Sequence, residues 1–240
     1  MPVLTRRRRM LTLAATGVTA LSLAAGAGQA VAATAQTCTI KSFAPTKFVV
    51  NATDTERTFT VKTSGCTQKS WRIDLVGGEG ESNELLATKA KPVVTFDPTL
   101  MENVFAGKYE VLVTVKSTDD KTSKKTFTFS LLRRSTFGSS FNIGPEPATA
   151  GATLKVVGNL KRVSWGTTPK YVNYTGRTVR LQFKASGTAT FVDKKILTTD
   201  AAGQVASTVK VTKSGTWRLH YAGNSTTGAS DSTTDAVTVR

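Results

Sequence analysis

The chain has 240 residues, and its 32 lysines and arginines outnumber its 16 aspartates and glutamates, which gives a formal net charge of +16. One histidine and two cysteines are too few to build a zinc site from cysteine and histidine ligands. The sequence also lacks the common hydrolase, nucleotide-binding and calcium-loop motifs. We therefore predict a protein that is not an enzyme and that holds no cofactor and no metal.

Residues 1–33 have the pattern of a secretory signal peptide. Four consecutive arginines at 6–9 precede an apolar run over 10–25, and small residues continue to Ala32 and Ala33. We expect cleavage there and a mature protein that is secreted, either extracellular or loosely associated with the cell surface. The arginines fit both general secretory and twin-arginine export. No later apolar run reaches the length of a transmembrane segment.

The two cysteines, Cys38 and Cys66, form an even pair in an exported chain, and each lies beside a predicted strand. We predict a disulfide between them, which in the loop-entropy model stabilises the fold by roughly 3 to 4 kcal/mol. A redox pair is disfavoured because the spacing is not Cys-x-x-Cys.

The first half of the mature chain alternates apolar and polar residues with period two, as half-buried strands do. In the clearest of these strands Tyr109, Val111, Val113 and Val115 share one face, which we assign to the core. The predicted strands cover residues 47–51, 58–62, 71–76, 93–96, 108–116 and 126–132.

The second half has the same pattern, with Val179, Leu181 and Phe183 predicted on the inner face of one strand. The segment 199–203 contains Asp200 and Gly203 where a type I turn favours them. The predicted strands cover residues 140–143, 153–157, 178–184, 190–198, 204–211, 216–221 and 235–239.

The two halves also share a short motif, Ala-Gly-Lys-Tyr-Glu-Val at 106–111 and Ser-Gly-Thr-Trp-Arg-Leu at 214–219. A glycine that opens a strand, followed by an aromatic residue that fills the end of a sandwich, is a packing device of immunoglobulin-like domains. The predicted fold is therefore all-β, with two tandem immunoglobulin-like β-sandwiches after the signal peptide. We place the first at 34–134, with the disulfide, and the second, more basic one at 135–240.

Without the four leader arginines the net charge falls to +12, of which residues 142–240 carry +8. Outside a cell this charge attracts wall polymers, acidic polysaccharides, anionic lipid headgroups or released nucleic acid. The simpler alternative is that the charge only maintains solubility.

The predicted connection over residues 161–177 is the best candidate binding surface, because long connections inside compact domains are often functional. Aromatic rings beside cations suit stacking on sugars or bases together with phosphate pairing. The alternative is that the aromatic residues fold back and cap the sandwich. The candidate residues are Lys161, Arg162, Trp165, Lys170, Tyr171, Tyr174 and Arg177.

Two other groups of residues are weaker candidates. His220 lies on a predicted strand, and the sequence has no nucleophile motif to accompany it in a catalytic triad. Acidic residues cluster at Glu79, Glu81 and Glu84 and at Asp119 with Asp120, where calcium could bind, but the spacing is irregular and favours solvated loops.

Several stretches resemble secreted immunoglobulin-like proteins of streptomycetes and related actinobacteria. They are Leu-Leu-Arg-Arg at 131–134, Pro-Glu-Pro at 145–147, residues 158–165, Tyr-Val-Asn-Tyr-Thr-Gly at 171–176, Leu-Gln-Phe at 181–183, Gly-Thr-Trp-Arg at 215–218 and residues 222–227. The resemblance covers the second predicted sandwich throughout and the first loosely. It implies tandem sandwiches and a non-catalytic role without supplying a substrate.

These features favour a secreted binding or cell-envelope-associated protein whose basic C-terminal domain contacts an anionic cell-wall polymer or glycan. Another extracellular protein is a further possible partner, and nucleic acid is not expected to be the physiological one. The alternative function is a structural or protein-interaction spacer whose sandwich edges pair with another protein and which takes no small ligand.

The disulfide gives the first testable prediction. The secreted protein should show no free thiol by mass spectrometry after alkylation without a reductant, and both cysteines should react once it is reduced. Two alkylated cysteines in the unreduced protein would contradict the predicted bridge between Cys38 and Cys66.

Overall fold

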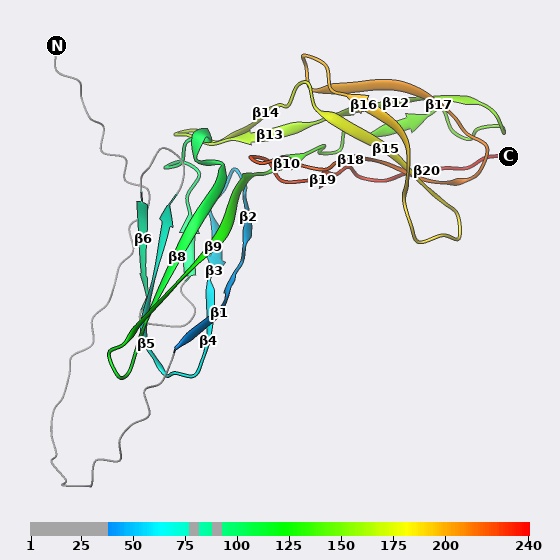
Figure 1. Cartoon of the computed structure of the whole chain (residues 1–240). Coiled ribbons are helices and arrows are strands. Elements are labelled where there is room, and N and C mark those ends of the chain that lie inside the picture. The colour runs from blue at the N-terminus through cyan, green and yellow to red at the C-terminus, as the bar shows by residue number, and fades with distance from the viewer. Residues whose placement is uncertain (1–37, 77–81, 88–92) are drawn as a thin grey trace, which may run out of the picture. The chain divides into compact units, whose positions relative to one another are not determined.

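The structure, a computed structural model, describes residues 38–76, 82–87 and 93–240 (Figure 1). The predicted signal peptide lies outside these residues. Within them the fold is all-β, as predicted, and the only helical element is a 3-10 turn, η1, at Asn103–Phe105. No helix in this part of the chain is long and apolar enough to cross a membrane.

The strands before residue 134 are β1 (Thr39–Ala44), β2 (Lys47–Val50), β3 (Thr55–Thr58), β4 (Thr60–Ser64), β5 (Gln68–Val76), β6 (Ser82–Ala87), β7 (Val93–Phe96), β8 (Gly107–Ser117) and β9 (Thr122–Arg133). Those after it are β10 (Ser135–Thr136), β11 (Asn142–Gly144), β12 (Thr153–Asn159), β13 (Lys161–Ser164), β14 (Lys170–Asn173), β15 (Thr178–Ala185), β16 (Val192–Thr198), β17 (Gln204–Lys210), β18 (Gly215–Tyr221), β19 (Ser230–Asp231) and β20 (Asp235–Val237).

The contacts of the chain group it into two compact units. The first unit takes its described residues from 1–46, 56–95 and 108–129, and the second comprises 47–55, 96–107 and 130–240. The second unit therefore contains two short segments from the early part of the chain. The sandwich boundaries predicted from the sequence remain a prediction.

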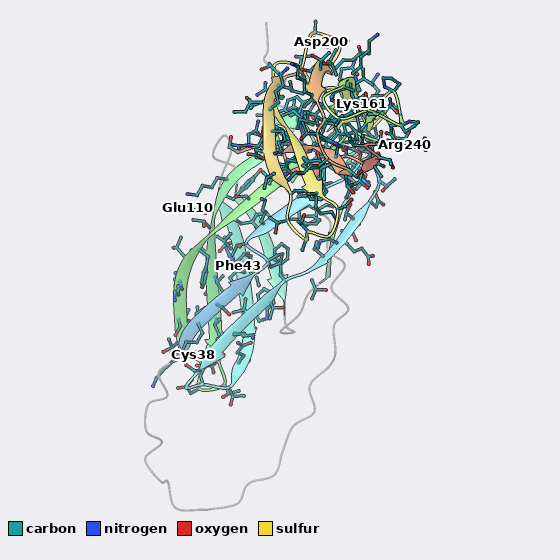
Figure 2. All side chains as sticks on the ribbon, turned by 90° about the vertical axis from the view of Figure 1, so that its right-hand side faces the viewer. Cys38, Phe43, Glu110, Lys161, Asp200 and Arg240 are labelled. Carbon is teal, nitrogen blue, oxygen red and sulfur yellow. A yellow bond between two sulfur atoms is a disulfide. The ribbon has the colours of Figure 1, made fainter. Side chains whose placement is uncertain are left out.

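The core of the first unit lies between the β1–β4 pair and the sheet that contains β8 and β9. The ring of Phe43 stacks on Phe59 at 5.4 Å between centroids, and Phe59 meets Phe129 edge-on at 5.8 Å. On β8, Tyr109 and the valines at 111, 113 and 115 are buried, which confirms the predicted inner face. Figure 2 shows Phe43 inside this unit and Glu110 on its outside.

The predicted disulfide is present. Cys38 precedes β1 and Cys66 follows β4, and the antiparallel register pairs Thr39 with Ser64. That pairing brings the two Cα atoms to 4.8 Å, within the range that a disulfide requires. The bridge therefore closes the open end of the β1–β4 pair.

In both halves of the chain, the first segment pairs antiparallel with one strand, and after a proline the chain crosses to pair in parallel with a different strand. β1 pairs antiparallel with β4, and after Pro45 the chain continues as β2, which pairs parallel with β9. In the second unit β11 pairs antiparallel with β12, and after Pro145 and Pro147 the chain forms a parallel bridge between Ala148 and Val239. Proline suits these breaks because it has no N–H to give to a ladder. This repeat confirms the prediction of two immunoglobulin-like sandwiches in succession.

The sandwich of the second unit has one sheet ordered β11-β12-β17 and another ordered β16-β15-β18-β19, with β20 also pairing with β18 (Figure 1). Its core lies between them and includes Leu154, Val179, Leu181 and Leu219. The turn between β16 and β17 matches its prediction, since the Asp200 carboxylate accepts hydrogen bonds from the backbone N–H groups of Ala202 and Gln204, each at 2.8 Å.

The glycine of the shared motif opens equivalent strands, as predicted. β8 begins at Gly107 and β18 at Gly215, and each pairs antiparallel with a central strand, β5 and β15 respectively. The two glycines have different surroundings. A Cβ atom at Gly215 would lie 2.4 Å from the Phe183 ring and 2.5 Å from the Lys184 carbonyl oxygen, whereas a Cβ at Gly107 would meet nothing within 4 Å.

This difference predicts opposite effects for one substitution. Gly215→Ala should lower the free energy of unfolding by about 1 to 3 kcal/mol, because the added methyl group overpacks against an aromatic ring and fixed backbone. Gly107→Ala is the matched control, and it should be neutral or stabilising by up to about 1 kcal/mol. Urea unfolding followed by circular dichroism measures both, and equal effects would contradict the packing role of Gly215.

Candidate binding site

The segment predicted as a long connection, 161–177, contains a β-hairpin, and the prediction of an irregular loop there is wrong. β13 pairs antiparallel with β14, with Lys161 opposite Asn173 and Val163 opposite Tyr171. β13 also pairs with the two-residue strand β10 through Lys161 and Arg162. The valines of both strands, at 163 and 172, fit this pairing, and the cationic residues around them obscured the pattern in the sequence.

Trp165 is buried, and it lies where the packing interpretation of the aromatic residues placed it. Its side chain is 4% exposed. Its backbone N–H donates to the Asn103 side-chain oxygen at 2.9 Å, and the Asn103 amide donates to the Ser164 hydroxyl at 2.9 Å. Trp165 therefore packs inside the second unit against the 96–107 segment and presents no open ring face.

Tyr174 is also buried, among cations that lie over its ring. The guanidinium carbons of Arg162 and Arg177 lie 4.1 and 4.6 Å from the ring centroid, which is cation–π distance. The Tyr174 hydroxyl accepts a hydrogen bond from the Asn224 amide at 2.8 Å, and its ring meets Tyr221 edge-on at 5.7 Å. This cluster orders the two arginines at the surface and leaves the tyrosine inside.

The two tyrosines of this cluster have opposite pKa shifts. Burial is the largest single influence on the pKa of Tyr174 and raises it, but its polar neighbours, among them Thr227, Asn224 and the Arg162 guanidinium, together lower it. Burial raises the pKa of Tyr221, and the neighbouring Tyr174 raises it further. The raised pKa of Tyr221 keeps that hydroxyl protonated at neutral pH.

The remaining aromatic candidate, Tyr171, lines a cavity together with Lys161, and we call this cavity the polar pocket. Its volume is about 630 Å³. Tyr171 is half-buried, and its hydroxyl donates to the Asn51 side-chain oxygen at 2.5 Å, which fixes the ring. Burial raises the pKa of Tyr171, so the hydroxyl keeps its proton. Lys161, labelled in Figure 2, is exposed at the same pocket.

Amide and hydroxyl side chains also line the polar pocket, and none of them was a sequence candidate. They are Thr136, Ser139, Ser140, Asn159, Asn173 and Gln204. Phe137, Gly138 and Ala202 complete the lining. Amide and hydroxyl groups both donate and accept, which is what binding to sugar hydroxyls requires, while one lysine can pair with an anionic substituent.

The polar pocket depends on the pairing of strands distant in sequence. The β12–β17 register places Asn159 opposite Gln204, and the Asn159 amide donates to the Ala202 carbonyl at 2.8 Å. The backbone N–H of Asn159 also donates to the Ser140 hydroxyl at 2.8 Å. The sequence predicted strands over 153–157 and 204–211 but did not predict that they pair. An alignment of these two strands would have been the one signal in the sequence that places Asn159 close to Gln204.

The other sequence candidates have structural contacts of their own. His220 Nδ1 lies 2.6 Å from an Asp231 carboxylate oxygen. The pKa of Asp119 is lowered, mainly by its hydrogen bond with Ser117. The pKa of Asp120 is lowered, mainly by its hydrogen bond with Lys69.

The other acidic group cannot be placed. Glu79 and Glu81 lie outside the described residues, as does the side chain of Glu84. In the part of the chain that the structure describes, no three acidic, histidine or cysteine side chains gather into a metal site.

The chain matches no protein-family model and no curated protein. Solved structures with similar folds include the tetra-tandem repeat from the extending region of a large adhesion protein (13% identity, 75% of this chain and 45% of that chain, TM-score 0.31). Two others are the D00-D0 domain of intimin (13%, 79% and 94%, 0.30) and native Escherichia coli alpha-2-macroglobulin (10%, 85% and 14%, 0.37). Similarities at these TM-scores carry no argument about function, and the fold assignment rests on the strand order.

The burial of Trp165 yields a prediction that separates packing from binding. Trp165→Ala should lower the free energy of unfolding by about 3 to 5 kcal/mol, as loss of a buried tryptophan does. Lys170→Ala, in the same hairpin but exposed, should stay within about 0.5 kcal/mol of the parent protein. Chemical denaturation tests both, and an unchanged stability in Trp165→Ala would contradict the packing role.

Proposed function

We propose that the protein is an exported, non-catalytic binding protein that contacts an anionic wall polymer or glycan through its basic second unit. The observation that carries this proposal is the polar pocket, in which Tyr171 and Lys161 meet amide and hydroxyl side chains. A flat ring, neutral hydrogen-bonding groups and one cation form a combination that suits a sugar bearing a carboxylate or phosphate.

The charge of the second unit supports the proposal. The unit contains 16 basic and 8 acidic side chains. Three of these acids are used within the fold: Asp193 and Asp231 pair with Arg180 and Arg218, and Asp200 accepts the N–H groups of its turn.

The cations of the 161–177 segment differ in this respect. Lys161, Arg162, Lys170 and Arg177 have no carboxylate partner among the described residues. They add uncompensated positive charge to the second unit, which attracts a polyanion. Of the four, Lys161 lines the polar pocket itself.

The location outside the cell is part of the proposal. The signal-peptide pattern of residues 1–33 supports export. The disulfide between Cys38 and Cys66 supports an oxidising compartment, because cytosolic proteins rarely keep such bonds.

A second candidate function is a spacer that pairs with another protein through a sheet edge. β16 ends its sheet, and it exposes Val192 and Ile196 at 49% and 65% of their surfaces. An edge strand with exposed apolar residues can accept a strand from a partner. This function requires no polyanion and therefore makes a different prediction for binding to cell wall.

Retention on a purified cell-wall fraction tests the proposal. The protein should bind at roughly 20 mM salt and be released at roughly 0.5 M, because salt screens exposed charges beyond a few ångströms. Lys161→Gln combined with Tyr171→Leu should reduce retention by about fivefold or more, which corresponds to a contact worth about 1 kcal/mol.

Lys155→Gln serves as the control, because Lys155 is an exposed lysine of the same unit that does not line the polar pocket. Equal retention of the double variant and this control would rule out the pocket as the contact. Absence of binding at both salt concentrations would instead favour the spacer function.

A further inference from the structure

The second unit has another cavity, which lies at the open edge of its sandwich. β16 ends one sheet and β17 ends the other, so no strand joins the two sheets on this side. The gap is a cavity of about 670 Å³ whose lining includes side chains of both edge strands, Val192 and Lys194 from β16 and Val209 and Lys210 from β17. We call it the lysine cavity. It shares no lining residue with the polar pocket.

Two aromatic rings, those of Phe183 and Trp217, line the lysine cavity. Phe183 and Trp217 are opposite each other in the β15–β18 register, and their ring centroids are 4.6 Å apart. Both are buried, with 8% and 3% exposure. The buried Trp217 Nε1 has no hydrogen-bond acceptor in the described residues, so no protein oxygen offsets its N–H dipole. The floor is therefore apolar, with one N–H donor that has no acceptor among the described residues.

Three lysines accompany these rings. Lys194, Lys210 and Lys213 line the cavity, and the Lys194 Nζ lies 5.5 Å from the centre of the Phe183 ring. None of the three forms an ion pair within the described chain, and no aspartate or glutamate is among the lining residues. The nearest acid in sequence, Asp193, accepts hydrogen bonds from Arg180 and Gln182.

Lysines on an edge strand can serve simply to prevent pairing with other chains. All three lysines are exposed, as that role requires, but it gives no reason for lysines of β16, β17 and the segment after β17 to line one cavity. The lining contains three positive charges and no carboxylate, so an anion in the cavity would meet only positively charged partners.

We propose that the lysine cavity binds a small anion attached to an apolar or aromatic ring, through its carboxylate or phosphate. The lysines would pair with the anionic group, and the ring would pack against Phe183 and Trp217. This site is independent of the proposed wall-binding function, because it uses different residues and a different ligand chemistry.

Titration with phenyl phosphate, followed through the indole ¹H–¹⁵N resonance of Trp217, tests the proposal. The resonance should shift and saturate with a dissociation constant on the order of 1 mM or tighter. Inorganic phosphate has the charge without the ring, and benzyl alcohol has the ring without the charge. Each should bind roughly tenfold or more weakly, because each lacks one of the two contacts.

Variants assign the effect to the cavity. Lys210→Gln combined with Lys213→Gln should weaken phenyl phosphate binding by about fivefold or more, because the charge partners are lost. Lys155→Gln combined with Lys170→Gln removes the same charge elsewhere on the unit and should leave binding unchanged. Benzoate in place of phenyl phosphate separates a preference for carboxylate from one for phosphate.

Three results would overturn the proposal: no saturable shift with phenyl phosphate or benzoate, equal binding of benzyl alcohol, or equal weakening by both lysine pairs. The first of these would be expected if a strand from a partner protein fills the gap. Lys161→Gln should not alter the Trp217 shift, so failure of the wall-binding proposal and failure of this one are separable.

Discussion

The contact between the Phe183 ring and the backbone of Gly215 organises the sandwich of the second unit. Any side chain at residue 215 would place a Cβ atom 2.4 Å from that ring. The glycine lets β15 and β18 bring Phe183 against Trp217. Because the two sheets are not joined beyond these rings, the same aromatic pair fills the core and lines the lysine cavity. One packing requirement thus explains the glycine of the sequence motif and the apolar character of that cavity.

The two cavities of the second unit have different chemistry, although both lie in the more basic half of the sequence. The polar pocket combines one lysine with neutral amides and hydroxyls. The lysine cavity combines three lysines with aromatic rings and threonines. The net charge of the sequence does not distinguish the two cavities. It does not record which cations have acidic neighbours, or whether polar or aromatic side chains lie next to them. The two proposed ligands, a glycan and a ring-bearing anion, differ because the linings of the two cavities differ.

The sequence was sufficient for features that depend on near neighbours. The alternation on β8, the turn at Asp200 and the glycine that opens β8 and β18 each follow from a few adjacent residues. The pairing of Cys38 with Cys66 followed because the chain has no other cysteine.

The candidate site could be predicted only in part, because its contacts join distant segments. Tyr171 meets Asn51 across 120 residues, and Trp165 meets Asn103 across 62. No periodicity encodes such contacts. Of the aromatic residues of 161–177, Trp165 and Tyr174 are buried, as the capping alternative expected, and Tyr171 lines the polar pocket. The binding role of this segment stays a prediction.

The parallel pairing near the two ends of the second sandwich has a mechanical consequence. The N–H of Ala148 donates to the Thr238 carbonyl at 3.0 Å, and the N–H of Arg240 donates to the Ala148 carbonyl at 2.9 Å. Tension applied before Ala148 and after Arg240 pulls these parallel segments in opposite directions along their length. The bonds are then loaded together in shear and do not open one after another. This sandwich therefore extends little under such a pull until both bonds rupture together.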